Sequence, residues 1–410
     1  MKYETRIPLL KDHHTHPSLY ASLSNSLDLR TIREKAQALE LIRAQKSPVT
    51  VVFGWNNSLY TFTREELESL KPVLICNVSL HSFLMNTPAK ERFTGGYPEI
   101  AANIEDPDWV ETNLPEIFKF IVNIQPGNVD HVAAFYAYLN RQGIWYAEEM
   151  LLPNAATIDS YRQLGYQGRT RFWADLKLFQ KLDVDDQKRV DGIKLFTDGA
   201  LGPCTAAIGE PYPEGGRGIL IYTDAELTAI LNTVADFGKP VAIHAIGDAA
   251  AEQVITALEN VLRSRGTLPP QVRMEHCQFI PPDTARRARS LGVVLSMQPN
   301  FNYDSVQYRD RLSAAYCVRN NPFRMLIDDI GFEPGKDLIF GSDGMPHGIK
   351  YALEMALFPP VEAQRLSLDE FTAGYCMESE EYGYIDLQID EAKQTVLSRV
   401  VIRSDGYPSK

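Results

Sequence analysis

Short apolar runs alternate with amphipathic stretches along most of the chain. This alternation is typical of parallel βα units, in which buried strands are joined by helices that cover the sheet. Amphipathic spacing predicts helices over 29–42, 224–237 and 248–264, and Thr63 to Glu66 has the form of a helix-capping box. The runs that predict strands are 7–16, 49–55, 72–78, 143–149, 171–176, 192–196, 240–244, 271–276, 293–298 and 337–343.

A strand–helix unit repeated about eight times predicts a closed (β/α)8 barrel of the TIM type, an α/β fold whose active site lies at the carboxyl ends of the strands. The apolar runs exceed eight, so one or two of them are expected outside the barrel. We treat residues 1–410 as one barrel domain.

The stretch 87–141 breaks this rhythm, because it is rich in Asn, Pro, Glu and aromatic residues. We expect it to be an inserted helical segment. It follows a strand that ends near His81, on the side where barrel active sites lie, so we predict that it forms a lid over the barrel mouth.

Composition narrows the class of protein. The chain has 44% hydrophobic residues and a net charge of −12, which argues against nucleic acid or an anionic membrane as the main partner. Five scattered cysteines without a CxxC pair fit a reducing compartment. With neither a signal-peptide core nor an apolar run of about 18 residues, a cytoplasmic protein acting on a small molecule is expected.

The first candidate for chemistry is Asp12-His13-His14-Thr15-His16, at the end of the first strand. Side chains alternate along a strand, so His14 and His16 point the same way and form a clamp for an ion such as zinc. Taken by itself, the motif could also be a surface histidine cluster or the remnant of an expression tag.

Further polar residues end later strands: His244, His276 and Asp343, while Lys194 lies within an apolar run. A barrel brings these positions together around one axis. Each has an ordinary alternative, since strand-end histidines often only pack, a strand-end Asp often caps a helix, and Lys194 could pair with Glu148 or Glu149. The joint pattern favours a metal centre.

With these motifs the chain resembles the metal-dependent amidohydrolase superfamily, and within it the amidohydrolase-3 (YtcJ-like) branch. The matching segments run in family order over most of the chain. They are Asp12–His16, Ile193–Gly202 continuing to Thr205–Ala207, His244–Asp248, Glu275–Gln278, Ser296–Pro299 and Gly341–Asp343, with weaker matches at Gly54–Asn56 and Leu80–Asn86.

The resemblance implies two metal ions, most simply zinc, with manganese, iron or nickel as alternatives. His14, His16 and Asp343 would hold one ion, and His244 and His276 the other. Lys194 would carry a carboxyl group on its amine and bridge both ions. A metal-activated hydroxide would attack an amide-type carbon.

The resemblance also implies roles around the ions. Asp343 would accept a proton and pass it to the leaving nitrogen, and the second ion, with His81 as a further candidate, would polarise the scissile carbonyl. The candidate substrate-binding residues are Trp55, His81, Asp198, Gly199, Gly202 and Thr205.

The chain departs from the family at its ends. Family members carry a small β-sandwich built from both termini, but only eleven residues precede Asp12, and 380–410 shows no clear strand of the family's type. We therefore expect the sandwich to be lost or reduced and the tail at 380–410 to be atypical. A homo-oligomer is left open by this change.

The leading hypothesis is a metal-dependent amidohydrolase that cleaves an amide-type C–N bond other than a peptide bond. Two alternatives stay open. One is a mononuclear deaminase-type hydrolase of the same superfamily, and the other is a non-catalytic metal-binding barrel.

Overall fold

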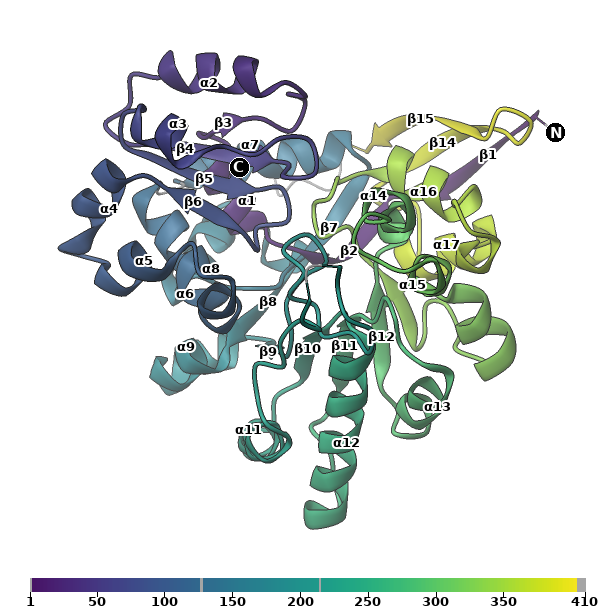
Figure 1. Ribbon diagram of the computed structural model, residues 1–410. Helices are drawn as coiled ribbons and strands as arrows, with labels where there is room; N and C mark the ends of the chain where they lie inside the picture. The colour runs from purple at the N-terminus through teal and green to yellow at the C-terminus, as the bar shows by residue number, and fades with distance from the viewer. Residues whose placement is uncertain (1, 126–127, 214, 404–410) are drawn as a thin grey trace.

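Eight parallel strands form the centre of the computed structural model, which describes residues 2–125, 128–213 and 215–403 (Figure 1). Beyond the last strand, the Asp343 N–H donates to the His14 carbonyl at 2.7 Å and draws the two outer strands together. The predicted (β/α)8 barrel is confirmed. In order around the sheet the strands are β2 (Leu10–Thr15), β7 (Ile144–Glu149), β8 (Thr170–Asp175), β9 (Gly192–Phe196), β10 (Val241–Ala245), β11 (Val272–His276), β12 (Val294–Met297) and β13 (Leu338–Phe340).

The barrel strands are apolar runs because helices cover their outer side while side chains fill the inside. Every residue of β9, β10 and β11 is buried. The predicted helices at 224–237 and 248–264 are present to within one residue at each end. The helices that follow barrel strands are α8 (Ala155–Gln163), α9 (Leu176–Lys181), α10 (Val184–Arg189), α11 (Asp224–Asp236), α12 (Asp248–Arg265), α13 (Pro282–Ser290), α16 (Ile349–Leu357) and α17 (Leu368–Tyr375).

The two predicted strands that lie outside the barrel are β4 (Thr50–Trp55) and β5 (Val73–Asn77). With β3 (Leu27–Asp28) and β6 (Phe83–Met85) they form a separate four-stranded sheet at the upper left of Figure 1. The sheet has its own apolar core with α2 (Lys35–Arg43) and α3 (Arg64–Glu68). The helix predicted at 29–42 therefore begins later, at Lys35, while Thr63 does cap α3 through the predicted box.

The insertion between β2 and β7 is longer than 87–141. It starts with α1 (Pro17–Leu23), includes the four-stranded sheet and continues through α4 (Thr87–Thr94), α5 (Pro98–Asn103), α6 (Pro107–Ile124) and α7 (Val129–Arg141). Helix α6 lies at the barrel mouth, where its side chains Leu114 and Phe118 line the cavity at the strand ends.

The two ends of the described chain meet in a third sheet. Strand β1 (Lys2–Pro8) pairs antiparallel with β14 (Gly383–Asp390), which pairs with β15 (Thr395–Ile402). No strand of the family's type was clear at 380–410, but β14 and β15 are regular strands there, and Ile385, Leu387 and Ile389 of β14 alternate into the core. Residues 404–410 lie outside the described part. A small sheet of both termini is thus present beside the barrel.

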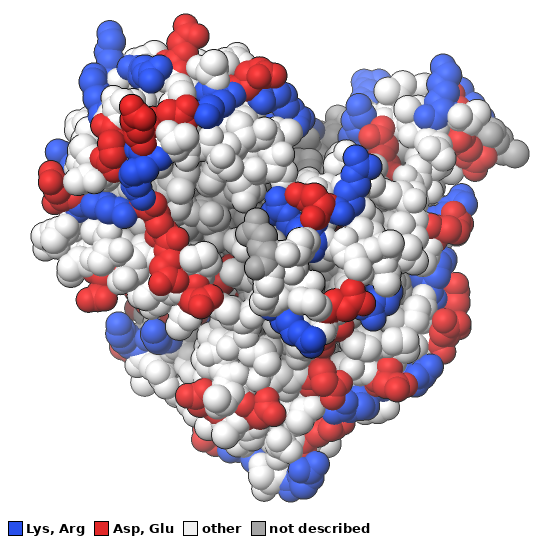
Figure 2. Space-filling model, viewed as in Figure 1, with Lys and Arg blue, Asp and Glu red and all other residues white. Residues whose placement is uncertain are grey.

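The remaining elements are short, and they are η1 (Gln167–Arg169), η2 (Pro299–Tyr303), α14 (Asp304–Gln307), α15 (Ala314–Arg319), η3 (Met325–Ile330) and η4 (Glu362–Gln364). Within the described ranges, no helix is both long and apolar enough to cross a membrane. Positive and negative side chains are mixed over the face seen in Figure 2.

Candidate metal centre

A small cavity lies at the carboxyl ends of the barrel strands, under helix α6. Five of the six predicted metal ligands line this cavity although they come from four strand ends far apart in sequence. They are His14, His16, His244, His276 and Asp343. The sixth, Lys194, lies next to it, with its Nζ 5.1 Å from the centre of the Phe196 ring.

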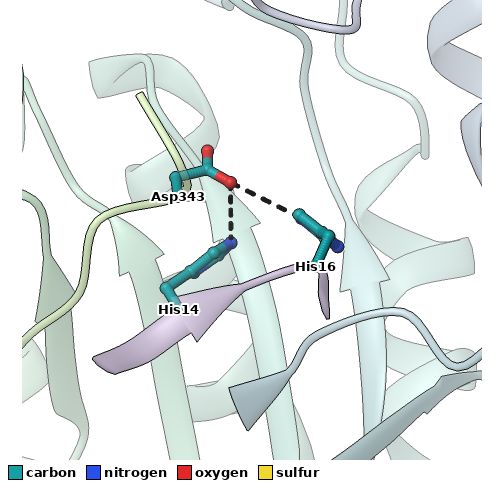
Figure 3. Close-up of side chains that lie close together, drawn as sticks. All are labelled: His14, His16 and Asp343. Carbon is teal, nitrogen blue, oxygen red and sulfur yellow. Dashed lines mark ion pairs between the residues drawn. The ribbon is translucent and has the colours of Figure 1, made fainter. Parts of the chain in front are cut away.

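The first ligand group comes from β2 and the segment after β13 (Figure 3). The Asp343 Oδ1 atom lies 3.8 Å from Nε2 of His14 and 3.5 Å from Nε2 of His16. Each of the three residues offers one ligand atom, and these atoms all lie within 4.8 Å of one another. Two imidazoles and a carboxylate at such spacing form a set that a divalent ion such as zinc accepts.

Buried polar side chains of the barrel strands orient this group through hydrogen bonds. The Nδ1 atom of His14 lies 2.7 Å from Glu275 Oε2, which leaves Nε2 for a ligand. Arg273 donates to Glu275 at 2.9 Å and to Glu148 at 2.6 Å, and all three side chains are buried. Metal-bound histidines are usually oriented by such partners. The sequence did not reveal this role for any of the three, although Arg273 and Glu275 are two charged residues two positions apart in the buried strand β11.

The second group comes from β10 and β11. The ring centres of His244 and His276 lie 4.6 Å apart, and His276 is equally close to His14. The Nδ1 atom of His276 is 2.8 Å from Gln298 Oε1, and Nε2 of His244 is 3.0 Å from the Gly199 carbonyl. Each ring therefore keeps one nitrogen available for an ion.

Lys194 is 1% exposed, and its amine has no hydrogen-bond partner among the described residues. The alternative partners are engaged elsewhere: Glu148 binds Arg273 and His13, and Glu149 accepts the Ser18 N–H at 2.7 Å. Burial lowers the pKa of Lys194 to about 8, which favours a neutral and hence reactive amine more than usual.

The site favours neutral imidazoles. Burial, and after it the charge of Lys194, lowers the pKa of His16 to about 3 and lowers the pKa of His14 well below its usual range. Burial, and after it the neighbouring His14, lowers the pKa of His276 well below its usual range. Burial raises the pKa of Asp343 to about 7, against the opposing effect of Lys194. Neutral imidazoles are the form that binds metal, so the donor set, with a partnerless buried amine beside it, fits a divalent ion.

His81 lines the same cavity and is held by a residue that the sequence did not single out. Its Nδ1 atom lies 2.7 Å from Oε2 of Glu111, which is 1% exposed on α6. Burial lowers the pKa of His81, but the carboxylates of Glu111, Asp343 and Asp198, with Glu111 foremost, together outweigh burial and the pKa is raised. Glu111 is one of several acidic residues on an amphipathic helix, so nothing in the local pattern marks it.

The predicted substrate-binding residues divide into two kinds. Only His81 and Gly202 line a cavity at the barrel mouth. Trp55 lies in the core of the four-stranded sheet, where its indole N–H donates to the Tyr60 carbonyl at 2.9 Å.

The other three predicted contacts shape the loop after β9. The Asp198 carboxylate accepts the N–H groups of Ala207, Ile246 and Gly247 at 2.8–3.0 Å. Gly199 presents its carbonyl to His244, and the Thr205 hydroxyl donates to Glu111 at 2.6 Å. These contacts hold the loop beside the metal ligands.

Comparisons with known proteins agree with this geometry. The model of the amidohydrolase family matches residues 5–348. The chain is 24% identical to the putative amidohydrolase YtcJ of Bacillus subtilis in an alignment of 360 positions, which covers 76% of this chain and 66% of YtcJ. It is 32% identical over 132 residues to the Arabidopsis thaliana protein LONG AFTER FAR-RED 3, covering 32% of this chain and 23% of the plant protein.

The fold is also found among solved structures. An uncharacterised metal-dependent hydrolase of Pyrococcus horikoshii superposes with a TM-score of 0.65 at 22% identity, over 90% of this chain and 78% of the other. The chain therefore spans a little under two thirds of YtcJ and about a quarter of the plant protein, but most of the archaeal hydrolase.

Proposed function

The chain belongs to the amidohydrolase family, and on that premise we propose that it is a metal-dependent hydrolase of an amide-type C–N bond in a small molecule. One observation carries the proposal. Four imidazoles and one carboxylate from four strand ends line one buried cavity, where each could be a metal ligand. The Lys194 amine lies beside the cavity without a hydrogen-bond partner among the described residues. Such a set of donors is costly to bury unless it binds something.

His14, His16 and Asp343 would hold one divalent ion, His244 and His276 a second, and zinc suits both groups. A bound ion supplies Lewis acidity, which lowers the pKa of a water molecule to about 7 and makes it a nucleophile at neutral pH. The remaining chemistry belongs to side chains of this chain.

Asp343 is the proton carrier in this proposal. Its side chain lines the cavity, where the carboxylate would take a proton from the attacking water and release it to the leaving nitrogen. His81 lies across the same cavity. With its pKa raised by Glu111, His81 can donate from Nε2 to the carbonyl oxygen as negative charge develops there.

Lys194 has a separate role, because an ammonium beside two cations is repelled. We propose that its neutral amine adds carbon dioxide with loss of one proton, which gives a carbamate able to bridge both ions. Its burial, its lowered pKa and the absence of a hydrogen-bond partner among the described residues support this assignment.

The mononuclear deaminase-type hydrolase is the second candidate. It is favoured by the compact group of His14, His16 and Asp343, which is complete without Lys194. Elemental analysis separates the two, because the leading proposal expects two ions per chain and the alternative expects one.

Activity is tested with a panel of N-formyl, N-acyl and cyclic amides, assayed on protein reconstituted with zinc or manganese. Hydrolysis of at least one amide that disappears with a chelator supports the proposal. Hydrolysis of amidine-type rings alone favours the deaminase. A fully metallated protein that is silent on the whole panel favours a non-catalytic metal-binding barrel.

A further inference from the structure

The geometry points to Glu111 as a positioning residue for His81, an inference that rests on the proposed function and extends it to the inserted helix α6. Glu111 lies in the insertion between β2 and β7, outside every barrel strand. Its carboxylate nevertheless reaches the barrel mouth with both oxygens engaged. Oε2 lies 2.7 Å from His81 Nδ1, and Oε1 accepts the Thr205 hydroxyl at 2.6 Å.

These two contacts join three segments that the chain keeps far apart. His81 follows β5 in the four-stranded sheet, Glu111 belongs to α6, and Thr205 belongs to the loop after β9. The same loop carries Gly199, whose carbonyl meets His244. The His81 ring lies 5.7 Å, centre to centre, from the His244 ring. Glu111 thus fixes a cavity-lining imidazole against the loop that also fixes a predicted metal ligand.

The approach of Glu111 to this loop is close enough to need a glycine. A Cβ atom built on Gly199 would lie 2.6 Å from the Glu111 Cδ atom and 2.2 Å from the Thr205 hydroxyl oxygen. Both distances are shorter than side chains tolerate. The loop backbone is therefore shaped to admit the carboxylate of Glu111 and the Thr205 hydroxyl together.

The consequence for His81 is orientation. A carboxylate at Nδ1 keeps a proton on that nitrogen and fixes the ring, so that Nε2 is the atom that meets the substrate and, when the ring is protonated, donates to it; a carboxylate orients a catalytic imidazole in this way. Burying a carboxylate costs desolvation free energy, and its two short hydrogen bonds offset that cost only if both partners stay in place. We therefore assign Glu111 to positioning His81, with Thr205 holding Glu111 in turn.

The test follows the ring nitrogens of His81 by NMR in full-length, zinc-reconstituted protein labelled with ¹⁵N-histidine, with the His81 signals identified through His81→Gln. In the wild-type protein the Nδ1 atom of His81 is expected to carry a proton. Glu111→Gln keeps the shape of the side chain and removes its charge, and it should move both His81 nitrogen signals. The matched control is Glu116→Gln, on the same helix but paired with Lys119, and it should leave them unchanged.

With any amide that the protein hydrolyses, Glu111→Gln is expected to lower kcat by about 10- to 100-fold, the usual cost of losing a partner that orients a ligand or catalytic imidazole, with KM nearly unchanged. Glu111→Asp should recover part of this loss. Zinc content measured on the same samples reports separately on the proposed metal centre. An unprotonated Nδ1 of His81 in the wild-type protein, or His81 signals that stay in place in folded Glu111→Gln, would overturn the assignment even if amides are hydrolysed.

Discussion

The two halves of the candidate metal centre differ in how complete they are. On the β2 side, His14, His16 and Asp343 bring three ligand atoms within 4.8 Å, and Glu275 and Arg273 hold His14 from below. On the β9–β11 side, His244 and His276 are equally well oriented, but the third member is an amine without a hydrogen-bond partner among the described residues. In our proposal the first half would hold an ion with its side chains as they stand. The second half would need a change in the chemical state of Lys194.

The difference separates an ion site that unmodified side chains can form from one that would also require a chemical modification. Imidazoles and carboxylates at the right spacing bind a divalent ion without modification. A lysine amine does not do so as an ammonium, so the second ion would depend on carbon dioxide as well as on the fold. The variants below test each half by itself.

The largest effect is expected from removing a ligand of the complete half. His14→Ala and His16→Ala should each abolish retention of the first ion and lower activity by more than the roughly 10- to 100-fold that is typical when an outer partner of a ligand is lost. Metal per chain is measured by elemental analysis after dialysis. His131→Ala, which changes a histidine on α7 that bonds Asn25, is the control. Full occupancy in the double variant His14→Ala/His16→Ala would contradict the assignment.

A smaller effect on activity is expected from Asp343→Asn, which keeps the shape of the side chain but removes the carboxylate that acts as the base. Asp343→Asn should fold normally and retain part of its metal, while kcat falls by about 100-fold or more because an amide cannot carry the proton. A kcat near that of the wild-type protein in Asp343→Asn would remove the residue from the mechanism.

The smallest effect is expected from the partners that orient the ligands. Glu275→Gln removes the carboxylate that contacts Nδ1 of His14 and should lower the affinity for the first ion by about 10- to 100-fold. Gln298→Ala removes the hydrogen-bond partner of His276 Nδ1 and should instead lower the affinity for the second ion. Two-step zinc titrations of both variants show which ion each one affects. Equal loss of both ions in either variant would show that the two halves are not separable.

Much of the fold follows from local pattern. The eight barrel strands are apolar because both their faces are covered, and that pattern is visible in the sequence. Strands β4 and β5 carry the same pattern for the same reason, so periodicity could not say that they pair with each other rather than with the barrel. The sheet of β1, β14 and β15 joins segments over 370 residues apart, a pairing that no local pattern reveals.

The site divides in the same way. His14, His16, His244, His276 and Asp343 could be predicted because they end strands, and a barrel brings strand ends together. Trp55 was proposed from a motif, but its indole lies in the core of the separate sheet. Glu111 could not be found, because its role depends on how an inserted helix packs against two distant loops.

The most direct test of the account is the chemical state of Lys194 in the metal-loaded protein. Metal-free protein is reconstituted with zinc and ¹³C-bicarbonate, and the product is examined by ¹³C NMR together with elemental analysis. We predict one labelled carbamate carbon and two ions per chain, with the carbamate signal and the second ion both absent in Lys194→Ala. Two bound ions per chain beside an unmodified Lys194 amine would contradict the account.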